Sequence, residues 1–318
     1  MTFLQLLKNK HIGYVSAIIA AMLFGSVSTI TKPILEDLNA LSVSSLTYII
    51  AGLSLIPFLK FSFTNSNSNS NNTLETTNNT SKKRKWTDNR KSYFLLLLTS
   101  LCGAVIAPTL FFYGLSNTSA SDSSILINGE VLFSILLAVV FFNEKLIKRE
   151  IIALILVLVG IVILTTNMQF LSSSNSFVEF NIGNILIVGS TLFWALDNNI
   201  SKILSKNIHI PKIIVLKTLI GGSLLFILTI TVFGIAEFDV DIIHVSYLVF
   251  AGSLGFGASL FFFLHSLKRI GTIKTILLFS TSSLFSMIFA KIFLNENITI
   301  YQIIAVGVIL GGLYLIKR

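Results

Sequence analysis

The sequence has few charged residues, four prolines and a single cysteine. Charged residues make up 12% and hydrophobic residues 53% of 318 positions, whereas an ordinary soluble domain is about 25% charged. Apolar runs of about 20 residues, enough to cross a bilayer, recur from end to end, and no soluble core could hide them all. The composition therefore excludes a soluble domain and predicts an integral membrane protein. Cys102 lies inside an apolar run and carries no information on redox compartment.

Two further absences narrow the class of protein. The first apolar run is followed by no small-residue cleavage site, so we expect a retained membrane span rather than a signal peptide. The chain has no Gly-x-Ser-x-Gly motif, and its four histidines form no His-xxx-His or Glu-xxx-His pair on a central span. An intramembrane enzyme would need a nucleophile with its base, or a metal cluster. We therefore expect no enzyme activity, no catalytic residue, no metal site and no cofactor.

Ten apolar segments have the length of a membrane span. Five lie in residues 1–166 and five in residues 167–318, so we expect an all-α integral membrane protein of ten transmembrane helices in two five-helix repeats. The predicted spans are 13–35, 39–61, 92–115, 118–143, 149–166, 183–204, 212–234, 243–267, 272–294 and 299–316.

Nearly all lysines and arginines fall on one side of this arrangement. They lie in the N-terminal segment, in the second, fourth, sixth and eighth connections, and at the C-terminus. Lys32 and Lys291 lie near span ends on the opposite side, and Lys217 lies inside the seventh span. The net charge of +9 is therefore better explained by membrane orientation than by nucleic acid. The positive-inside rule predicts a protein of the cytoplasmic (cell) membrane with both termini cytoplasmic.

The second connection, residues 62–91, has an unusual composition. A Ser/Asn/Thr tract at 62–81 precedes a basic cluster at 82–91. Such a segment cannot bury enough apolar surface to fold, so we expect a flexible, disordered cytoplasmic loop whose basic end could touch anionic lipid headgroups. Asn71, Asn78 and Asn79 match the glycosylation pattern, but a cytoplasmic loop would not meet the glycosylation machinery.

One segment occurs twice. Residues 141–153 contain Phe-Phe-Asn-Glu followed by Ile-Ile-Ala, and residues 293–305 contain Phe-Leu-Asn-Glu followed by Ile-Ile-Ala at the same spacing. The register continues to Gly160 against Gly312. An odd number of spans per repeat forces the second copy to enter the membrane inverted. Inverted repeats are typical of secondary transporters.

The repeat and several shorter motifs resemble the EamA-type transporters of the drug/metabolite transporter superfamily. The resemblance covers nearly the whole chain except 62–91. It implies a small-molecule carrier, in most members an exporter of metabolites that include amino acids. The family usually has a proline in the first half of the fourth and ninth spans, where this chain has Ile-Asn-Gly-Glu (127–130) and Ser-Thr-Ser-Ser (280–283). The matching motifs are Leu-Phe-Gly (23–25), Leu-Phe-Phe-Tyr-Gly-Leu (110–115) with Ser-Ala-Ser (119–121), Leu-Phe-Trp (192–194), and Leu-Phe-Phe-Phe (260–263) with Thr-Ile-Lys-Thr (272–275).

Two carboxylates lie deep within predicted spans. Glu130 follows the start of the fourth span by about 12 residues, roughly 18 Å, which is near the midplane. Asp197 lies at a comparable depth in the sixth span, which belongs to the other half, so both are expected to line one site. We predict that Glu130, and secondarily Asp197, binds a cationic or amine-bearing substrate or a coupling proton. The alternative is a hydrogen-bonded acid that only ties helices together. Further candidates around them are Asn128, Asn198 and Asn199.

Aromatic residues and motif glutamates have two interpretations each. Tyr113, Trp194 and Phe263 form either an aromatic wall of the substrate site or packing contacts. Glu144 and Glu296 lie at span ends, where helix termination and loop contacts are favoured over gating.

Glycines at helical spacing indicate close helix packing. Gly307 and Gly311 form a Gly-xxx-Gly pair in the tenth span. We expect this pair to pack within the chain, with a homodimer face as the alternative.

These patterns together favour a secondary transporter. We expect it to export a small neutral, zwitterionic or cationic, amino-acid-like metabolite by alternating access, as a monomer or homodimer in a lipid bilayer. A nucleotide-sugar or phosphate-ester antiporter is the second candidate, but its substrates would require Lys or Arg in the central cavity, where the deepest ionisable residues are acidic. A channel or a non-transporting membrane scaffold is the alternative of a different class.

Overall fold

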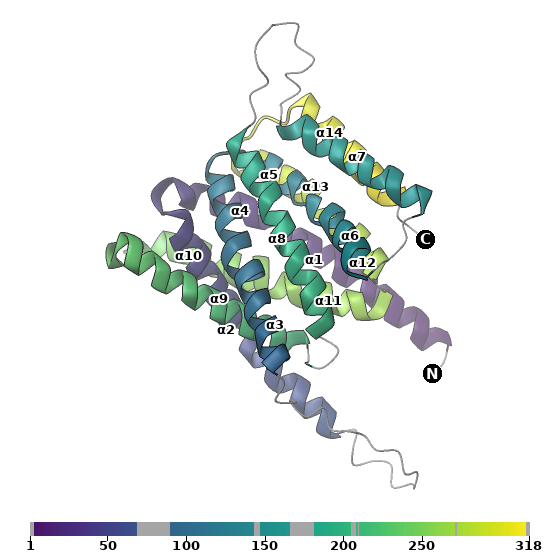
Figure 1. Ribbon diagram of the computed structural model, residues 1–318, viewed down its shortest axis with the longest axis horizontal. Helices are drawn as coiled ribbons and strands as arrows, with labels where there is room; N and C mark the ends of the chain where they lie inside the picture. Colours follow the sequence, from purple (N-terminus) through teal and green to yellow (C-terminus); the bar gives the residue numbers. More distant parts are fainter. Residues whose placement is uncertain are drawn as a thin grey trace, which may run out of the picture.

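The computed structural model describes residues 3–68, 90–142, 147–165, 181–204, 208, 210–238, 240–270 and 272–315, and these ranges contain helices and no strand. Figure 1 shows the helices packed as one bundle, with α7 and α14 paired at one edge. The first half contains α1 (Phe3–Asp37), α2 (Ala40–Ser68), α3 (Arg90–Leu101), the π-helix η1 (Cys102–Ile106), α4 (Ala107–Ser116), α5 (Ala120–Leu126), α6 (Gly129–Phe142) and α7 (Lys148–Thr165). The second half contains α8 (Ile182–Leu204), α9 (Ile210–Phe233), the 3-10 helix η3 (Ile235–Phe238), α10 (Ile242–Phe250), the π-helix η4 (Ala251–Ala258), α11 (Ser259–Ile270), α12 (Thr272–Phe279), α13 (Ser282–Phe293) and α14 (Ile300–Leu315).

Each predicted span corresponds to one helix or to a row of consecutive helices. The third span is α3, η1 and α4, and the eighth is α10, η4 and α11; the fourth is divided into α5 and α6, and the ninth into α12 and α13. By length and composition, five helical segments are able to cross a membrane, and three shorter helices are apolar as well. The predicted all-α membrane fold is confirmed.

The connection after α2 is shorter than predicted. Because α2 continues to Ser68 and α3 begins at Arg90, residues 62–68 and 90–91 are helical rather than part of a flexible loop. Once an apolar span has nucleated a helix, each further residue adds one hydrogen bond at little cost. The rest of the predicted loop lies outside the described ranges.

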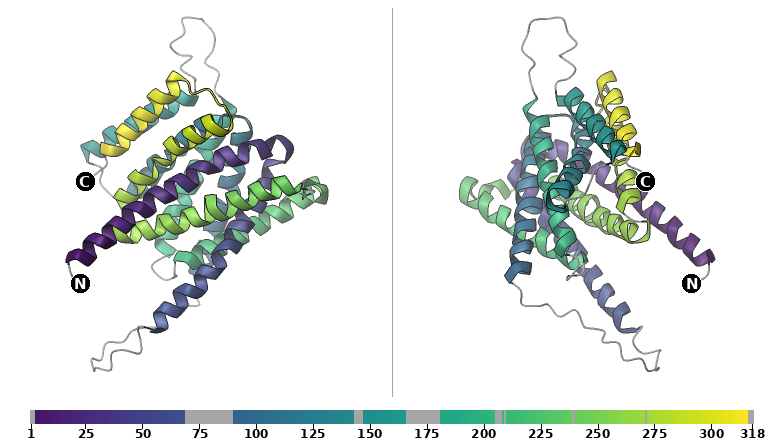
Figure 2. Two further views of the ribbon diagram at one scale, coloured as in Figure 1. Left: turned by 180° about the vertical axis from the view of Figure 1, so that it is seen from behind. Right: turned by 45° about the vertical axis from the view of Figure 1, so that its right-hand side comes forward.

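Helix contacts in one half have counterparts in the other. α2 packs on α9 and α7 packs on α14, which pairs the second span with the seventh and the fifth with the tenth. α8 contacts α4 and α6, just as α1 contacts α11 and α13; Figure 2 shows α1 lying along the second-half helices. Exchanging the halves maps these contacts onto one another, as expected for two inverted repeats.

The contact between α7 and α14 is reciprocal. A Cβ placed on Gly160 would lie 3.2 Å from the Ala305 carbonyl oxygen, and one placed on Gly312 would lie 3.0 Å from the Ala153 carbonyl oxygen. These four residues are equivalent pairs of the repeated segment. Equivalent residues exchange contacts in this way across a two-fold axis, so the repeat of the sequence is also a repeat of the packing.

The prediction for Gly307 and Gly311 was wrong for the described part of the chain. A Cβ on either residue would meet no described atom within 4 Å, so this Gly-xxx-Gly pair makes no close contact within the described chain. α14 instead packs through the face that carries Gly312.

We expect Gly160→Val to lower the midpoint of thermal unfolding in detergent. Its side chain would overlap Ile309 and the Ala305 backbone, and overpacking typically costs about 1–3 kcal/mol. Gly311→Val is the matched control, because it adds the same side chain on the open face of α14. Equal midpoints for the two variants would contradict the reciprocal contact.

The fourth and ninth spans are broken without a proline. Between α5 and α6, Asn128 Nδ2 donates a hydrogen bond to the Ile125 carbonyl at 3.0 Å. At the corresponding break before α13, Thr281 Oγ1 donates to the Leu278 carbonyl at 2.6 Å. Polar side chains that bond to local carbonyls compete with the regular helix ladder. The break places Glu130 in the first turn of α6, where the helix dipole favours a negative charge.

Candidate functional site

Glu130 and Asn198 meet at the boundary between the two halves. Asn198 Nδ2, on α8, donates a hydrogen bond to Glu130 Oε1, on α6. Asn198 is exposed and Glu130 is half-buried. No ion pair to Glu130 occurs among the described residues. The predicted proximity of the fourth and sixth spans is thus present, with the Glu130 carboxyl group between them.

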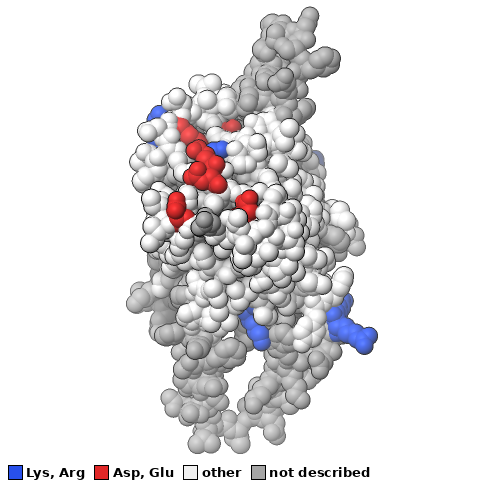
Figure 3. Space-filling view, turned by 90° about the vertical axis from the view of Figure 1, so that its left-hand side faces the viewer, with Lys and Arg blue, Asp and Glu red and all other residues white. Residues whose placement is uncertain are grey.

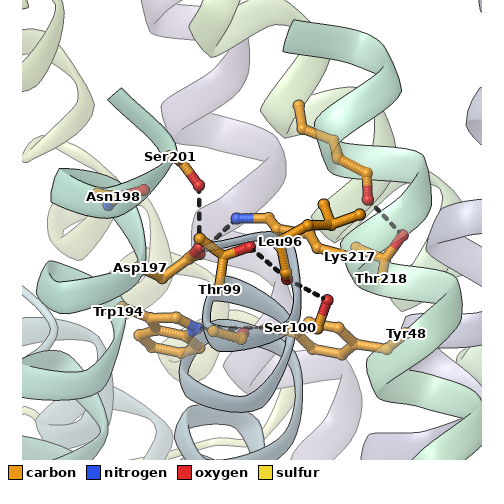
Figure 4. A network of polar contacts seen from close by, with 12 residues as sticks. Tyr48, Leu96, Thr99, Ser100, Trp194, Asp197, Asn198, Ser201, Lys217 and Thr218 are labelled. Atoms are coloured by element: carbon orange, nitrogen blue, oxygen red, sulfur yellow. Dashed lines mark hydrogen bonds and ion pairs between the residues drawn. The ribbon is translucent and has the colours of Figure 1, made fainter. Parts of the chain in front are cut away.

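Asp197 is engaged in a buried ion pair that the sequence did not suggest. Lys217 Nζ, on α9, pairs with Asp197 Oδ2, and Ser201 Oγ donates to Asp197 Oδ1 at 3.0 Å (Figure 4). Asp197 is 3% exposed and Lys217 is 8% exposed. Lys217, which lies inside the seventh predicted span, therefore points into the bundle. The two deep carboxylates therefore differ in kind, one paired and one not.

The backbone of η1 packs directly against this ion pair. A Cβ on Gly103 would overlap the Asp197 carboxyl group and would lie 2.7 Å from Asp197 Cβ. Trp194 Nε1 donates to both the Gly103 carbonyl and the Tyr48 hydroxyl, at 3.3 Å each (Figure 4). π-helical turns often occur at functional sites. Here the residue of the turn that lies against the Asp197 carboxyl group is a glycine, and any larger residue would leave no room for that carboxyl group.

Only part of the predicted aromatic set comes together. Trp194 stacks obliquely on Phe111, with ring centroids 5.4 Å apart, and Phe263 packs edge-to-face on Phe279 at 4.9 Å. Phe24, Phe256, Phe112 and Tyr48 connect the two groups through further ring contacts. Tyr113 instead bonds through its hydroxyl to Asn39 Oδ1, at 3.2 Å. Phe111, rather than Tyr113, is the α4 neighbour of Trp194.

The remaining predicted asparagines make local bonds. Asn128 is 5% exposed and its amide caps the end of α5. Asn199 Nδ2 donates to the Ala195 carbonyl at 2.9 Å, and more weakly to the Ser134 carbonyl at 3.5 Å. Asn198 is therefore the asparagine whose amide bonds to the Glu130 carboxyl group.

The second copy of the repeated Asn-Glu pair acts structurally. Asn295 has a φ of 53°, a left-handed conformation that Asn and Gly adopt most easily at a helix C-terminus. Glu296 then accepts hydrogen bonds from the Ala120 and Ser121 backbone amides, at 2.8 and 3.1 Å, and so caps α5 of the other half. The favoured interpretation, helix termination and contacts, is confirmed for this copy. Glu144 lies outside the described residues.

A buried acid near the start of the fourth span was missed. Asp122 is 5% exposed and accepts a hydrogen bond from Gln302 Nε2 of α14 at 2.7 Å. Its backbone amide bonds to Ser119 Oγ at 2.9 Å. The pattern Ser-x-x-Asp, which is typical of a helix N-terminus, was the available signal. Asp122 joins the halves, as Glu296 does, away from Glu130. The described residues contain no group of three or more His, Cys, Asp or Glu able to hold a metal.

Fold and site together define a multi-pass membrane protein of ten helices in two inverted five-helix repeats, with a polar centre between them. A profile described as "EamA-like transporter family" matches residues 11–166 and 181–318. A protein from Methanothermobacter thermautotrophicus, described as an uncharacterized transporter, is 32% identical over 307 residues, which cover 96% of this chain and 85% of that protein. A solved structure described only as a protein crystal structure superposes with a TM-score of 0.62 at 13% identity, over 96% of both chains, which shows the fold alone. The chain belongs to the EamA-like transporter family, as the sequence motifs predicted.

Proposed function

We propose that this transporter carries a small neutral, zwitterionic or cationic metabolite, and that Glu130 holds the cargo or a coupling proton. The observation that carries the proposal is the half-buried carboxyl group of Glu130, which is bonded to Asn198 between the two repeats and forms no ion pair with any described residue. A carboxylate in this position favours an amine or a proton over an anion. The cargo crosses the membrane without chemical conversion.

Alternating access is the mechanism that this architecture supports best. The Glu130 site lies where the two repeats meet, and rocking one repeat against the other would open it to each side in turn. Glu296 and Asp122 join the halves on one side of the site. Their bonds would have to break for the site to open there. The resemblance favours export as the direction of flux.

The distribution of charges supports an orientation with both termini in the cytoplasm. Figure 3 shows the acidic side chains of one face gathered in its upper part, together with a few basic ones, and further basic side chains without acidic ones in the lower half. At the acidic end, His244 Nε2 lies 3.1 Å from Asp37 Oδ2. The positive-inside rule assigns the basic end to the cytoplasm, in the cytoplasmic membrane.

A nucleotide-sugar or phosphate-ester antiporter is less well supported. Lys217 does place one cation near the centre, but Asp197 occupies it. Among the described side chains, the two carboxylates and one ammonium of this centre leave a negative balance, which would repel a multiply charged phosphate.

The test begins with a thermal-shift screen of the purified protein against metabolites, since a ligand that prefers the native state raises its stability. A stabilising ligand is then loaded into liposomes that carry the protein. We expect saturable uptake and counterflow for an amine, with weaker or no response to sugar phosphates. Linear flux would indicate a pore. A response to phosphates alone would contradict the proposed cargo.

A further inference from the structure

Lys217 and Asp197 form a buried ion pair within electrostatic reach of Glu130. Their side chains are only 10% and 4% exposed, and Asp197 is further held by Ser201 and by the close approach of Gly103. The neighbouring residue in the chain, Asn198, is exposed and bonds to Glu130. Glu130 and Asn198 are thus more exposed than the ion pair.

Few other titratable groups face this centre. Asp197 and Lys217 lie within electrostatic reach of Glu130, and Asp197 lies within reach of Tyr48 on α2 and Cys102 on η1. The charged residues of α3 and α7, which also pack near α6 and α8, are confined to the first turns of those helices. Among the side chains that the structure describes, the centre thus contains two carboxyl groups and one ammonium group.

We propose that Lys217 is a positioning residue that permanently compensates Asp197, so that Glu130 alone exchanges charge and the site takes up one positive charge at a time, either one proton or one monovalent amine. This inference rests on the proposed function of Glu130. Without Lys217, two neighbouring carboxylates would face each other away from water, and such pairs share protons rather than ionise independently. Lys217 prevents this coupling. It therefore fixes the charge that a cargo must have.

Protonated carboxyl groups can be counted without a known substrate, by infrared difference spectroscopy of the purified protein during a pH titration. In the wild type we expect one titrating carboxylic-acid band from this centre, which Glu130→Gln removes. Lys217→Met should add a second band, because Asp197 then takes up a proton. Lys217→Arg keeps the positive charge and should keep a single band. In Asp197→Asn/Lys217→Met, the second band should be lost and the Glu130 band should remain.

These variants distinguish the role of Glu130 in transport from the compensation of Asp197 by Lys217. If Glu130→Gln leaves the wild-type titration unchanged, the proposed function of Glu130 fails. If Glu130→Gln removes the band but Lys217→Met adds none, only the compensation by Lys217 is overturned. Should Lys217→Met not yield folded protein, Lys217→Gln takes its place, because glutamine removes the positive charge but can still donate a hydrogen bond to Asp197. A second band in Lys217→Gln supports the proposal, whereas a single band overturns it.

Discussion

Glu130→Gln is expected to lower the rate of counterflow in liposomes by about 10- to 100-fold, the effect of losing about 1.5–3 kcal/mol from an interaction with a charged group. The glutamine keeps the size of the side chain and can still bond to Asn198, so the fold should persist. What it cannot do is carry a negative charge or exchange a proton. The loss should therefore appear in transport and in its pH dependence, and the melting temperature should change little.

Glu237→Gln is the matched control for this variant. It makes the same chemical change in the η3 turn, which follows the end of α9 that is far from Lys217. We expect transport at the wild-type rate. If Glu130→Gln also kept the wild-type rate and pH profile, Glu130 would be a structural acid that ties α6 to α8.

Gly103→Ala is expected to lower the stability of the protein strongly. The new Cβ would overlap the Asp197 carboxyl group, which would have to leave Lys217. Removing one partner from a buried ion pair costs about 3–5 kcal/mol, and displacement of Asp197 should approach that range. The readout is the midpoint of thermal unfolding, together with the loss of counterflow.

Gly189→Ala provides the comparison on α8. Its Cβ would lie 3.6 Å from Leu110 Cδ1, an ordinary contact, so it should be neutral or slightly stabilising, since alanine favours helix. If both substitutions left the unfolding midpoint unchanged, η1 would not approach Asp197 as closely as the structure shows.

Features that follow from position along the chain could be predicted from the sequence. Span length and the sorting of basic residues located the ten spans, because burial in lipid demands about 20 apolar residues whatever their partners are. The repeated segment then predicted that the second repeat is inverted in the membrane, and therefore that the fourth and sixth spans lie next to each other between the repeats. For that reason Glu130 and Asn198 were predicted near each other before any contact was known.

Features that depend on the rotation of a helix about its own axis could not be predicted. Helices such as α2 and α9 show no amphipathic periodicity, so the sequence does not reveal which of their faces points inward. Lys217 could equally have faced the headgroups, and Gly311 could have faced the protein. The close approach of Gly103 depends on a π-helical turn, for which the sequence gives no clear signal. The orientation of the helices in the fold therefore had to be known before Asp197, rather than Glu130, could be identified as the partner of Lys217.

The central claim is that Glu130 carries either the cargo or a proton. Its most direct test is calorimetric titration of the purified protein with the stabilising amine, in buffers that differ in ionisation enthalpy. The account predicts that the wild type releases protons, up to one per bound amine, when the titration starts at a pH where Glu130 is protonated, and that Glu130→Gln releases none. Equal affinity and equal proton release in both proteins would contradict it.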